Sequence, residues 1–319
     1  MSPHPVVLLM GPTASGKTGL AMALAARLEA RGSAAEIVSV DSAQVYRGMD
    51  IGTAKPDAEM RARVTHHLLD VCDPAEPYSA ARFAADARRL VGEIQSRGHL
   101  PLLVGGSMLY FRAYTGGLSD LPSADPELRA RLTEQARRSG WPALHAQLMQ
   151  LDTPTAMRLH PNDGHRIQRA LEVVMASGRP LSAQRAETLP SDRAFDGVKL
   201  ALMPPDRAGL HERIATRLQQ MLAQGLADEV RRLHARGDLH PGLPSIRSVG
   251  YRQMWAWIEG ECDLAQAAQK ALEATRQFAK RQITWLRSEH DPCWLNSEAP
   301  DAVDVALRRI DEWKPRSPC

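Results

Sequence analysis

The sequence has no apolar stretch of the roughly 18 residues that a helix needs to cross a bilayer. Residues 1–10 also lack the basic segment that opens a signal peptide. Cysteine is scarce: the four cysteines are scattered, and no pair has the C-x-x-C spacing of a zinc ribbon or a thioredoxin-type site. We therefore expect reduced thiols, no membrane segment and a cytoplasmic protein.

A strong net charge is missing as well. Lysine and arginine together number 40 against 37 acidic residues, so the formal net charge is +3. This balance permits a polyanionic partner without requiring one, because the clustering of charge matters more than its sum. The chain is 24% charged and 44% hydrophobic, an ordinary composition that excludes a disordered, collagen-like or coiled-coil protein. A length of 319 residues suggests two domains.

Short apolar segments alternate with helical patterns at both ends of the chain. Strands are predicted at 5–10, 36–40, 100–104 and 198–203, and helices at 19–30 and 79–96. Such alternation favours a parallel sheet covered by helices on both faces. We therefore predict an α/β fold.

Residues 122–195 contain no convincing strand. Helical patterns cover residues 126–139, 142–151 and 166–176, so we predict a helical insertion between the two parts of the α/β core, 1–121 and 196–319. Two more long helices are expected, at 210–233, with Gly225 as a point where it breaks or kinks, and at 264–287. The C-terminal stretch from Glu298 is expected to be frayed.

A phosphate-binding loop follows the first strand and precedes the first helix, matching G-x-x-x-x-G-K-[ST]. It consists of Gly11, Pro12, Thr13, Ala14, Ser15, Gly16, Lys17 and Thr18. Backbone N–H groups and the helix N-terminus can bind phosphate oxygens, while Lys17 neutralises charge and the Thr18 hydroxyl can hold Mg²⁺. The alternative, a chance glycine-rich turn, does not explain the strand–loop–helix context. The motif indicates a di- or triphosphate ligand and leaves the reaction open.

Two further polar segments end predicted strands. Asp41, Ser42, Ala43 and Gln44 follow the strand at 36–40, and Ser107 follows the strand at 100–104. Ligands of open α/β sheets bind at this carboxyl edge. Asp41 is either a group that holds Mg²⁺ through water or accepts a proton, or a turn cap. Ser107 is either a ligand contact or part of an ordinary tight turn.

Three segments contain two or more basic side chains each: 165–169, 246–253 and 280–287. Basic edges can follow a nucleic-acid backbone, and arginine with aromatic residues can hold unpaired bases. For any one segment, a solvated helix face is the alternative. Three such segments in a nearly neutral chain favour a nucleic-acid partner.

These segments together resemble one family, the bacterial tRNA dimethylallyltransferases. The resemblance rests on motifs that occur in the family's order over nearly the whole chain: Gly11-Pro-Thr-Ala-Ser-Gly-Lys-Thr18, Asp41-Ser-Ala-Gln-Val-Tyr46, Gly52-Thr-Ala-Lys55, His66-His-Leu-Leu-Asp70, Gly105-Gly-Ser-Met-Leu-Tyr110, Arg166-Ile-Gln-Arg-Ala-Leu-Glu172, Ser248-Val-Gly-Tyr-Arg-Gln253 and Ala279-Lys-Arg-Gln-Ile-Thr-Trp-Leu-Arg287. Ser107 stands where the family usually has threonine, and His165 where it usually has glutamine. The resemblance implies a P-loop NTPase-like core with a mainly helical insertion.

The resemblance also implies an activity: transfer of a dimethylallyl group from dimethylallyl diphosphate to N6 of adenosine 37 in tRNA, with diphosphate released. Asp41, Ser107 and Lys17 would be catalytic, residues 11–18 would hold the diphosphate, and Thr18 would hold Mg²⁺, the expected cofactor. The target adenosine would leave the anticodon stack, as in base flipping. We expect a monomer whose insertion contacts the anticodon stem-loop.

Twenty-five residues are expected, on the same resemblance, to contact tRNA. They are Asp41, Ser42, Ala43, Gln44, Ser107, Arg129, His165, Arg166, Ile167, Gln168, Arg169, Arg247, Ser248, Val249, Gly250, Tyr251, Arg252, Lys280, Arg281, Gln282, Ile283, Thr284, Trp285, Leu286 and Arg287.

Two rival functions fit part of the sequence. A small-molecule P-loop kinase using Mg²⁺-ATP explains residues 11–18 and Asp41 but leaves the basic segments at 246–253 and 280–287 without a role. A non-enzymatic RNA-binding module explains the basic segments but needs neither Lys17 nor Asp41.

Overall fold

The computed structural model describes residues 4–116, 125–187 and 195–314. The chain forms two compact units, one made of Met1–Thr115 and Phe195–Cys319, the other of Gly116–Ala194. The predicted insertion, 122–195, falls on nearly the same division of the chain. Its predicted start at residue 122 lies outside the described residues.

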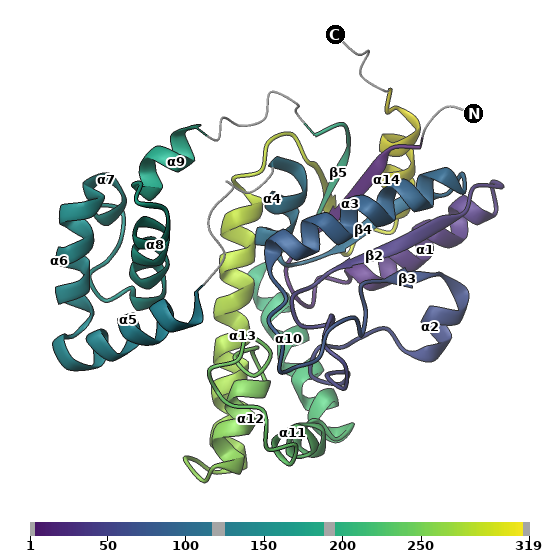
Figure 1. Cartoon of the computed structure of the whole chain (residues 1–319). Helices are drawn as coiled ribbons and strands as arrows, with labels where there is room; N and C mark the ends of the chain where they lie inside the picture. Colours follow the sequence, from purple (N-terminus) through teal and green to yellow (C-terminus); the bar gives the residue numbers. More distant parts are fainter. Residues whose placement is uncertain (1–3, 117–124, 188–194, 315–319) are drawn as a thin grey trace. The chain divides into compact units, whose positions relative to one another are not determined.

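A parallel sheet forms the centre of the first unit (Figure 1). Its six described strands lie in the order β3-β2-β4-β1-β5-β6, and every neighbouring pair is parallel. The strands are β1 (Val6–Met10), β2 (Ala35–Val40), β3 (His66–His67), β4 (Leu100–Gly105), β5 (Gly197–Met203) and β6 (Cys293–Asn296). The predicted α/β fold class is therefore confirmed.

Alternate residues of each central strand pack on opposite faces of the sheet. In β1, Val7 and Leu9 belong to a core cluster with α1 (Lys17–Glu29) and α14 (Ala302–Asp311). The other residues of β1 belong to a second cluster, which contains α3 (Ala80–Ser96). Because both faces are buried, β1 is apolar throughout rather than alternating in polarity.

The described part of the first unit contains six more helices. They are α2 (Ala58–Arg63), α4 (Met108–Gly116), α10 (Arg207–Ala223), α11 (Leu226–His234), α12 (Tyr251–Ile258) and α13 (Leu264–Leu286). The predicted helix at 210–233 is two helices, because Gly225 has φ 98 and begins α11 in the left-handed conformation that glycine tolerates.

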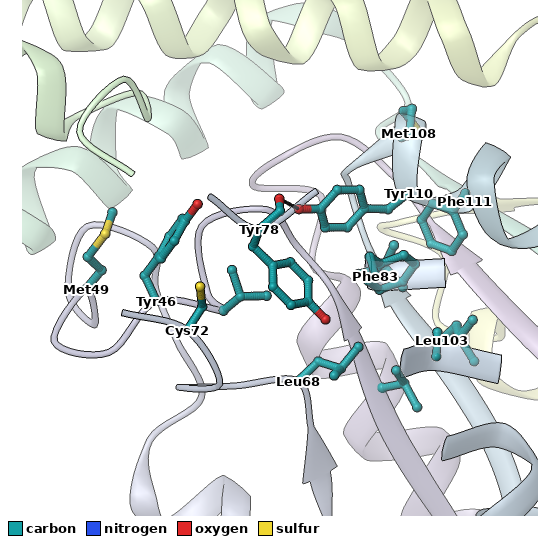
Figure 2. Close-up of a cluster of buried hydrophobic side chains, with 14 of the residues drawn as sticks. Tyr46, Met49, Leu68, Cys72, Tyr78, Phe83, Leu103, Met108, Tyr110 and Phe111 are labelled. Atoms are coloured by element: carbon teal, nitrogen blue, oxygen red, sulfur yellow. Dashed lines mark hydrogen bonds between the residues drawn. The ribbon is translucent and has the colours of Figure 1, made fainter. Parts of the chain in front are cut away.

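A buried aromatic cluster includes side chains from the start of α4 (Figure 2). The rings of Phe83 and Tyr110 are stacked, with centroids 4.4 Å apart and planes inclined by 16°. The Tyr110 hydroxyl donates a hydrogen bond to the backbone carbonyl of Tyr78 over 3.0 Å, drawn as a dashed line in Figure 2. These contacts fix the helix that directly follows Ser107.

The second unit, within its described residues, is entirely helical. Its helices are α5 (Pro126–Ser139), α6 (Trp141–Leu151), α7 (Thr153–Ala156), α8 (Gly164–Ser177) and α9 (Leu181–Glu187). Leu132, Leu144, Leu148, Ile167 and Leu171 are central in its separate hydrophobic core. The predicted mainly helical insertion is confirmed as part of the fold class.

Two strands, β3 and β6, were not predicted from the sequence, and neither were the helices α2, α4, α7, α9, α12 and α14. β3 has only two residues and β6 only four, and both depend on pairing with distant strands. The expectation of a frayed stretch from Glu298 is wrong as far as α14, because Ala306 and Leu307 are buried in the core that contains α1. Residues 315–319 lie outside the described part of the chain.

Two predictions concern membranes and thiols. Among the described residues, no helix is long and apolar enough to span a bilayer. Cys72, Cys262 and Cys293 are free thiols, as expected, and Cys319 lies outside the described part.

Candidate active site

Three loops meet at the carboxyl edge of the sheet. The phosphate loop follows β1, the segment Asp41–Gln44 follows β2, and Ser107 follows β4. Since β2, β4 and β1 are adjacent parallel strands, their C-terminal loops necessarily come together. The structure thus places all three predicted catalytic positions at one edge.

The phosphate loop is held by its own lysine and by a distant glutamine. Lys17 Nζ donates to the Pro12 carbonyl over 2.6 Å. Gln282 of α13 accepts the Thr13 N–H at 2.9 Å and donates to the Gly106 carbonyl at 2.8 Å. Gln282 is only 4% exposed, so it ties the loop after β1 to the loop after β4 rather than presenting itself to RNA. The N-terminus of α1 opens at Gly16 beside this loop and favours an anion there.

The surroundings of Lys17 disfavour the positive charge of its ammonium group. Burial, reinforced by the charge of Arg217, lowers the pKa of Lys17 to about 7, while Asp41 acts in the opposite direction. Burial also lowers the pKa of Arg217. Lys17 and Arg217, two neighbouring basic groups near a helix N-terminus, favour binding of a ligand with two or three negative charges.

Asp41 serves as a turn cap with one oxygen only. Its Oδ1 accepts the backbone N–H of Ala43 at 2.8 Å and of Gln44 at 3.3 Å. Within the described residues, no hydrogen bond to Oδ2 is found, and the Asp41 side chain borders both cavities described below. The two readings of Asp41 that the sequence left open are therefore compatible, since the cap leaves one oxygen for a proton.

Ser107 is bonded to the same turn. Its Oγ accepts the backbone N–H of Ser42 at 2.9 Å and donates to the Ser42 hydroxyl at 3.2 Å. The hydroxyl therefore joins the loops after β4 and β2. Through these two hydrogen bonds, Ser107 helps to position the turn that contains Asp41.

Two adjoining cavities open at this edge, within the first unit. The first cavity, of about 360 Å³, is lined by residues 13–18 of the phosphate loop together with Gln44 and the segment Thr53–Pro56. The second cavity, of about 380 Å³, is lined by Ser42, Ala43, Ser107, Arg281 and residues 247–251. Their shared lining residues are Thr13, Ala14, Asp41, Thr53, Gly106, Arg217 and Phe278. Six of the eight predicted diphosphate residues, 13–18, thus line the first cavity, whereas Gly11 and Pro12 line neither. Predicted tRNA residues line mostly the second cavity, and Asp41 lies on both.

The remaining predicted tRNA residues of the first unit fall into two groups. Arg252, Lys280, Thr284 and Arg287 are exposed. Leu286 is fully buried in the core of the first unit, and Ile283 packs in a smaller cluster with Leu210 and Ile214 of α10. Burial argues against direct RNA contact by Leu286, which instead holds α13 in place.

In the second unit, two of the predicted tRNA residues, Arg129 and Arg169, lie at one buried carboxylate, Glu172. Arg129 of α5 pairs with Glu172 of α8 through two hydrogen bonds, at 2.8 and 3.1 Å, and Arg169 lies 3.5 Å from the same carboxylate. Gln168 donates to the Arg129 carbonyl at 3.1 Å. Ile167 is fully buried, which argues against its predicted contact with RNA. Arg166, by contrast, has an exposed side chain and lies 3.5 Å from the carboxylate of Asp163 at the start of α8.

Arg217 is the main site residue that the sequence analysis missed. It lies on α10, inside a helix that was predicted, and it lines both cavities. One arginine among several on an amphipathic helix carries no local signal. Its position in the site depends on packing of α10 near loops more than 100 residues earlier in the chain.

The fold and the cavities define the class of the protein: an α/β phosphate-loop protein with a second cavity beside its phosphate-binding cavity. The model of the IPP transferase family matches residues 44–289. A tRNA dimethylallyltransferase of Paraburkholderia phymatum is 57% identical, with 97% of each chain covered. A relative from Bordetella parapertussis with the same name is 55% identical over 95% of this chain and 96% of its own.

Solved structures agree with these relatives. A tRNA isopentenylpyrophosphate transferase of Bacillus halodurans is 35% identical, with a TM-score of 0.69 and 97% of each chain covered. A eukaryotic dimethylallyltransferase acting on tRNA has a TM-score of 0.79 at 24% identity, covering 98% of this chain and 81% of its own, which shows a shared fold. The chain belongs to the IPP transferase family, a family of prenyl-transferring enzymes, and the predicted family is confirmed.

Proposed function

We propose that the chain transfers a dimethylallyl group from dimethylallyl diphosphate to N6 of adenosine 37 in tRNA and releases diphosphate. The observation that carries this proposal is the pair of adjoining cavities. The phosphate loop lines one cavity, residues predicted to contact tRNA line the other, and Asp41 borders both. The names of the relatives support the same activity.

The first cavity takes the donor's diphosphate. Lys17, Arg217 and the backbone N–H groups of the loop face the negative charge that grows on the leaving group. Placing these cations before the reaction removes the need to reorganise solvent during it. The donor's C1–O bond breaks toward this cavity.

Thr18 offers an exposed hydroxyl on the wall of the first cavity. Among the described residues, no group of three His, Cys, Asp or Glu side chains could hold a metal ion by itself. This donor set suits Mg²⁺, which commonly uses one or two protein ligands and completes its coordination with phosphate oxygens and water. Mg²⁺ bound by Thr18 and the diphosphate would neutralise part of the leaving group's charge.

Asp41 takes the proton from the acceptor. As N6 of the adenosine bonds to C1 of the dimethylallyl group, it loses one proton, and the Oδ2 of Asp41 receives it. The two N–H bonds to Oδ1 hold the carboxylate in position for this transfer. Ser107 keeps the turn in place through Ser42.

The second cavity takes the flipped adenosine, and the surrounding arginines bind the anticodon stem-loop. Arg247 and Arg281 line this cavity, while Arg252 and Lys280 are exposed on the same helices and loop. The arginines of α8 in the second unit bind the RNA as well. We propose that the enzyme acts as a monomer in the cytoplasm.

A donor competition separates this function from that of a small-molecule kinase. The protein is incubated with anticodon stem-loop RNA and dimethylallyl diphosphate, with and without excess Mg²⁺-ATP. We expect prenylated RNA and released diphosphate in both cases, and no ADP. Consumption of ATP with a small alcohol acceptor, together with no use of dimethylallyl diphosphate, would establish the kinase instead.

A further inference from the structure

Glu229, on α11, is a carboxylate with no place in the mechanism above. Its residue is 2% exposed. Arg231, a nearby basic residue on the same helix, forms its salt bridge with Asp228 rather than with Glu229. A buried carboxylate is costly unless it accepts several good hydrogen bonds.

Glu229 accepts four such bonds from two segments far apart in the chain. Its Oε2 accepts the backbone N–H groups of Asp50 at 2.9 Å and Ile51 at 2.8 Å. Its Oε1 accepts the N–H of Gly52 at 3.1 Å and the hydroxyl of Tyr251 at 2.6 Å. Three consecutive N–H groups form a concave anion-binding arrangement, here filled by a side chain of the same protein.

Tyr251 closes this arrangement from the other side. It is fully buried, and burial together with the Glu229 charge raises the pKa of its hydroxyl well above the ordinary range, so the hydroxyl stays protonated and donates. A Cβ atom added to Gly52 would lie 2.6 Å from the Tyr251 ring. Only glycine allows the loop to lie this close to the ring.

The loop has a second anchor, Lys55. Lys55 Nζ donates to the Tyr46 carbonyl at 2.9 Å and to the carboxylates of Asp50 and Asp70 at 2.5 and 2.6 Å. The three donors of the ammonium are thereby all used. In a variant at Glu229 or Tyr251, Lys55 therefore still holds the loop through the Tyr46 carbonyl and the Asp50 carboxylate.

Both segments that Glu229 joins line the second cavity. Gly52 and Thr53 form part of one wall, and residues 247–251, which end at Tyr251, form another. We propose that Glu229 and Tyr251 are positioning residues that hold these two walls together and so set the fit of the second cavity to the acceptor adenosine. This inference rests on the proposed function for the identity of the acceptor.

The test compares three variants of the full chain with the unaltered protein. Tyr251→Phe keeps the ring against Gly52 and removes only the hydroxyl. Glu229→Gln puts an NH₂ group among the N–H donors. Tyr78→Phe is the matched control, because the Tyr78 hydroxyl donates to the Asp86 carboxylate at 2.7 Å in the aromatic cluster of Figure 2 and lines neither cavity.

Steady-state kinetics with anticodon stem-loop RNA and dimethylallyl diphosphate supply the readout. For Tyr251→Phe we expect the KM for RNA to rise about tenfold, as for loss of a hydrogen bond to a charged group, with the KM for the donor unchanged. Glu229→Gln should have a larger effect in the same direction. The double variant should be no worse than Glu229→Gln, because both changes break one network.

Tyr78→Phe shows how far loss of a hydrogen bond between a tyrosine hydroxyl and a carboxylate lowers the stability of the protein when neither cavity is involved. We expect it to lower the melting temperature as Tyr251→Phe does and to leave both KM values unchanged. If Tyr251→Phe keeps the KM for RNA at the unaltered value, or raises the KM for the donor equally, the inference is wrong. If the unaltered protein does not prenylate the RNA, the proposed function fails instead.

Discussion

Lys17 is the residue whose charge state is most open to measurement. With a pKa near 7, its ammonium is only partly protonated at neutral pH, whereas binding of a diphosphate requires the charged form. Above pH 7, donor binding must therefore take up a proton. The affinity for dimethylallyl diphosphate should fall as the pH rises, by up to about tenfold per pH unit.

Lys17→Arg provides the comparison, because guanidinium stays charged throughout this range. The affinity of both proteins for dimethylallyl diphosphate is measured by calorimetric titration from pH 6.5 to 9. Because ionisation of the ligand affects both proteins equally, the difference between the two pH profiles reports on residue 17. We expect the decline in affinity for the unaltered protein and a much flatter profile for the variant. Parallel profiles would show that Lys17 is fully charged in the free protein.

At the scale of elements, Glu36 joins three strands at the edge of the sheet opposite the site. It accepts hydrogen bonds from His67 of β3 at 2.6 Å, from His99 just before β4 at 2.7 Å, and from Arg97 at 2.9 Å. The burial of Glu36 would raise its pKa, but hydrogen bonds from Arg97, His67 and His99 outweigh burial and lower the pKa from 4.5 to about 2. These contacts hold β2, β3 and β4, two of which carry loops of the site.

A depressed carboxyl pKa stabilises the folded state above the unfolded value. The contribution of Glu36 is therefore complete above about pH 4.5 and is lost as the pH falls from 4.5 toward 2. We expect Glu36→Gln to lower the free energy of unfolding by about 3 kcal/mol at pH 7, and by progressively less below pH 4.5. Urea unfolding at several pH values measures this difference.

Glu93→Gln is the control for that experiment. Glu93 pairs with Arg89 one turn earlier on α3, but both side chains are about half exposed. Exposed ion pairs contribute little to stability, so the free energy of unfolding should change by less than about 1 kcal/mol. Equal effects of the two variants would contradict the assigned role of the Glu36 cluster.

Elements were predictable where their signal is local. The strands β1, β2, β4 and β5 are mainly apolar, and the phosphate loop is a contiguous motif with its own strand and helix. β3 escaped prediction because two histidines have no strand pattern, and their pairing with Ile37 and Val38 exists only in the folded sheet. The helix α14 was missed because its amphipathic pattern is short and near the end of the chain.

Site residues divide in the same way. Asp41 and Ser107 lie in the loops after predicted strands, and Lys17 ends the loop after another, so the topology of a parallel sheet brings them to one edge. Arg217 and Glu229 act on loops that are far away in sequence, and nothing in their own neighbourhoods reveals the partner. Gln282 was placed in an RNA-binding segment by the resemblance, whereas the structure shows that it ties the phosphate loop to Gly106.

For the whole molecule, the account requires that one chain bring a donor diphosphate and a tRNA adenosine to opposite sides of Asp41. Asp41→Asn tests this better than removal of the side chain, because asparagine keeps an oxygen to accept the N–H groups of the turn. We expect tRNA affinity to be nearly unchanged and kcat to fall by about 10²- to 10⁴-fold, the usual effect of losing a general base.

The most direct measurement is mass analysis of nucleosides from unmodified tRNA that has been incubated with the full chain, Mg²⁺ and dimethylallyl diphosphate. We expect adenosine 37 to gain one dimethylallyl group with the unaltered protein, and almost no prenylated adenosine to form with Asp41→Asn in the same time. Unmodified adenosine 37 after incubation with the unaltered protein, or undiminished prenylation by Asp41→Asn, would contradict this expectation.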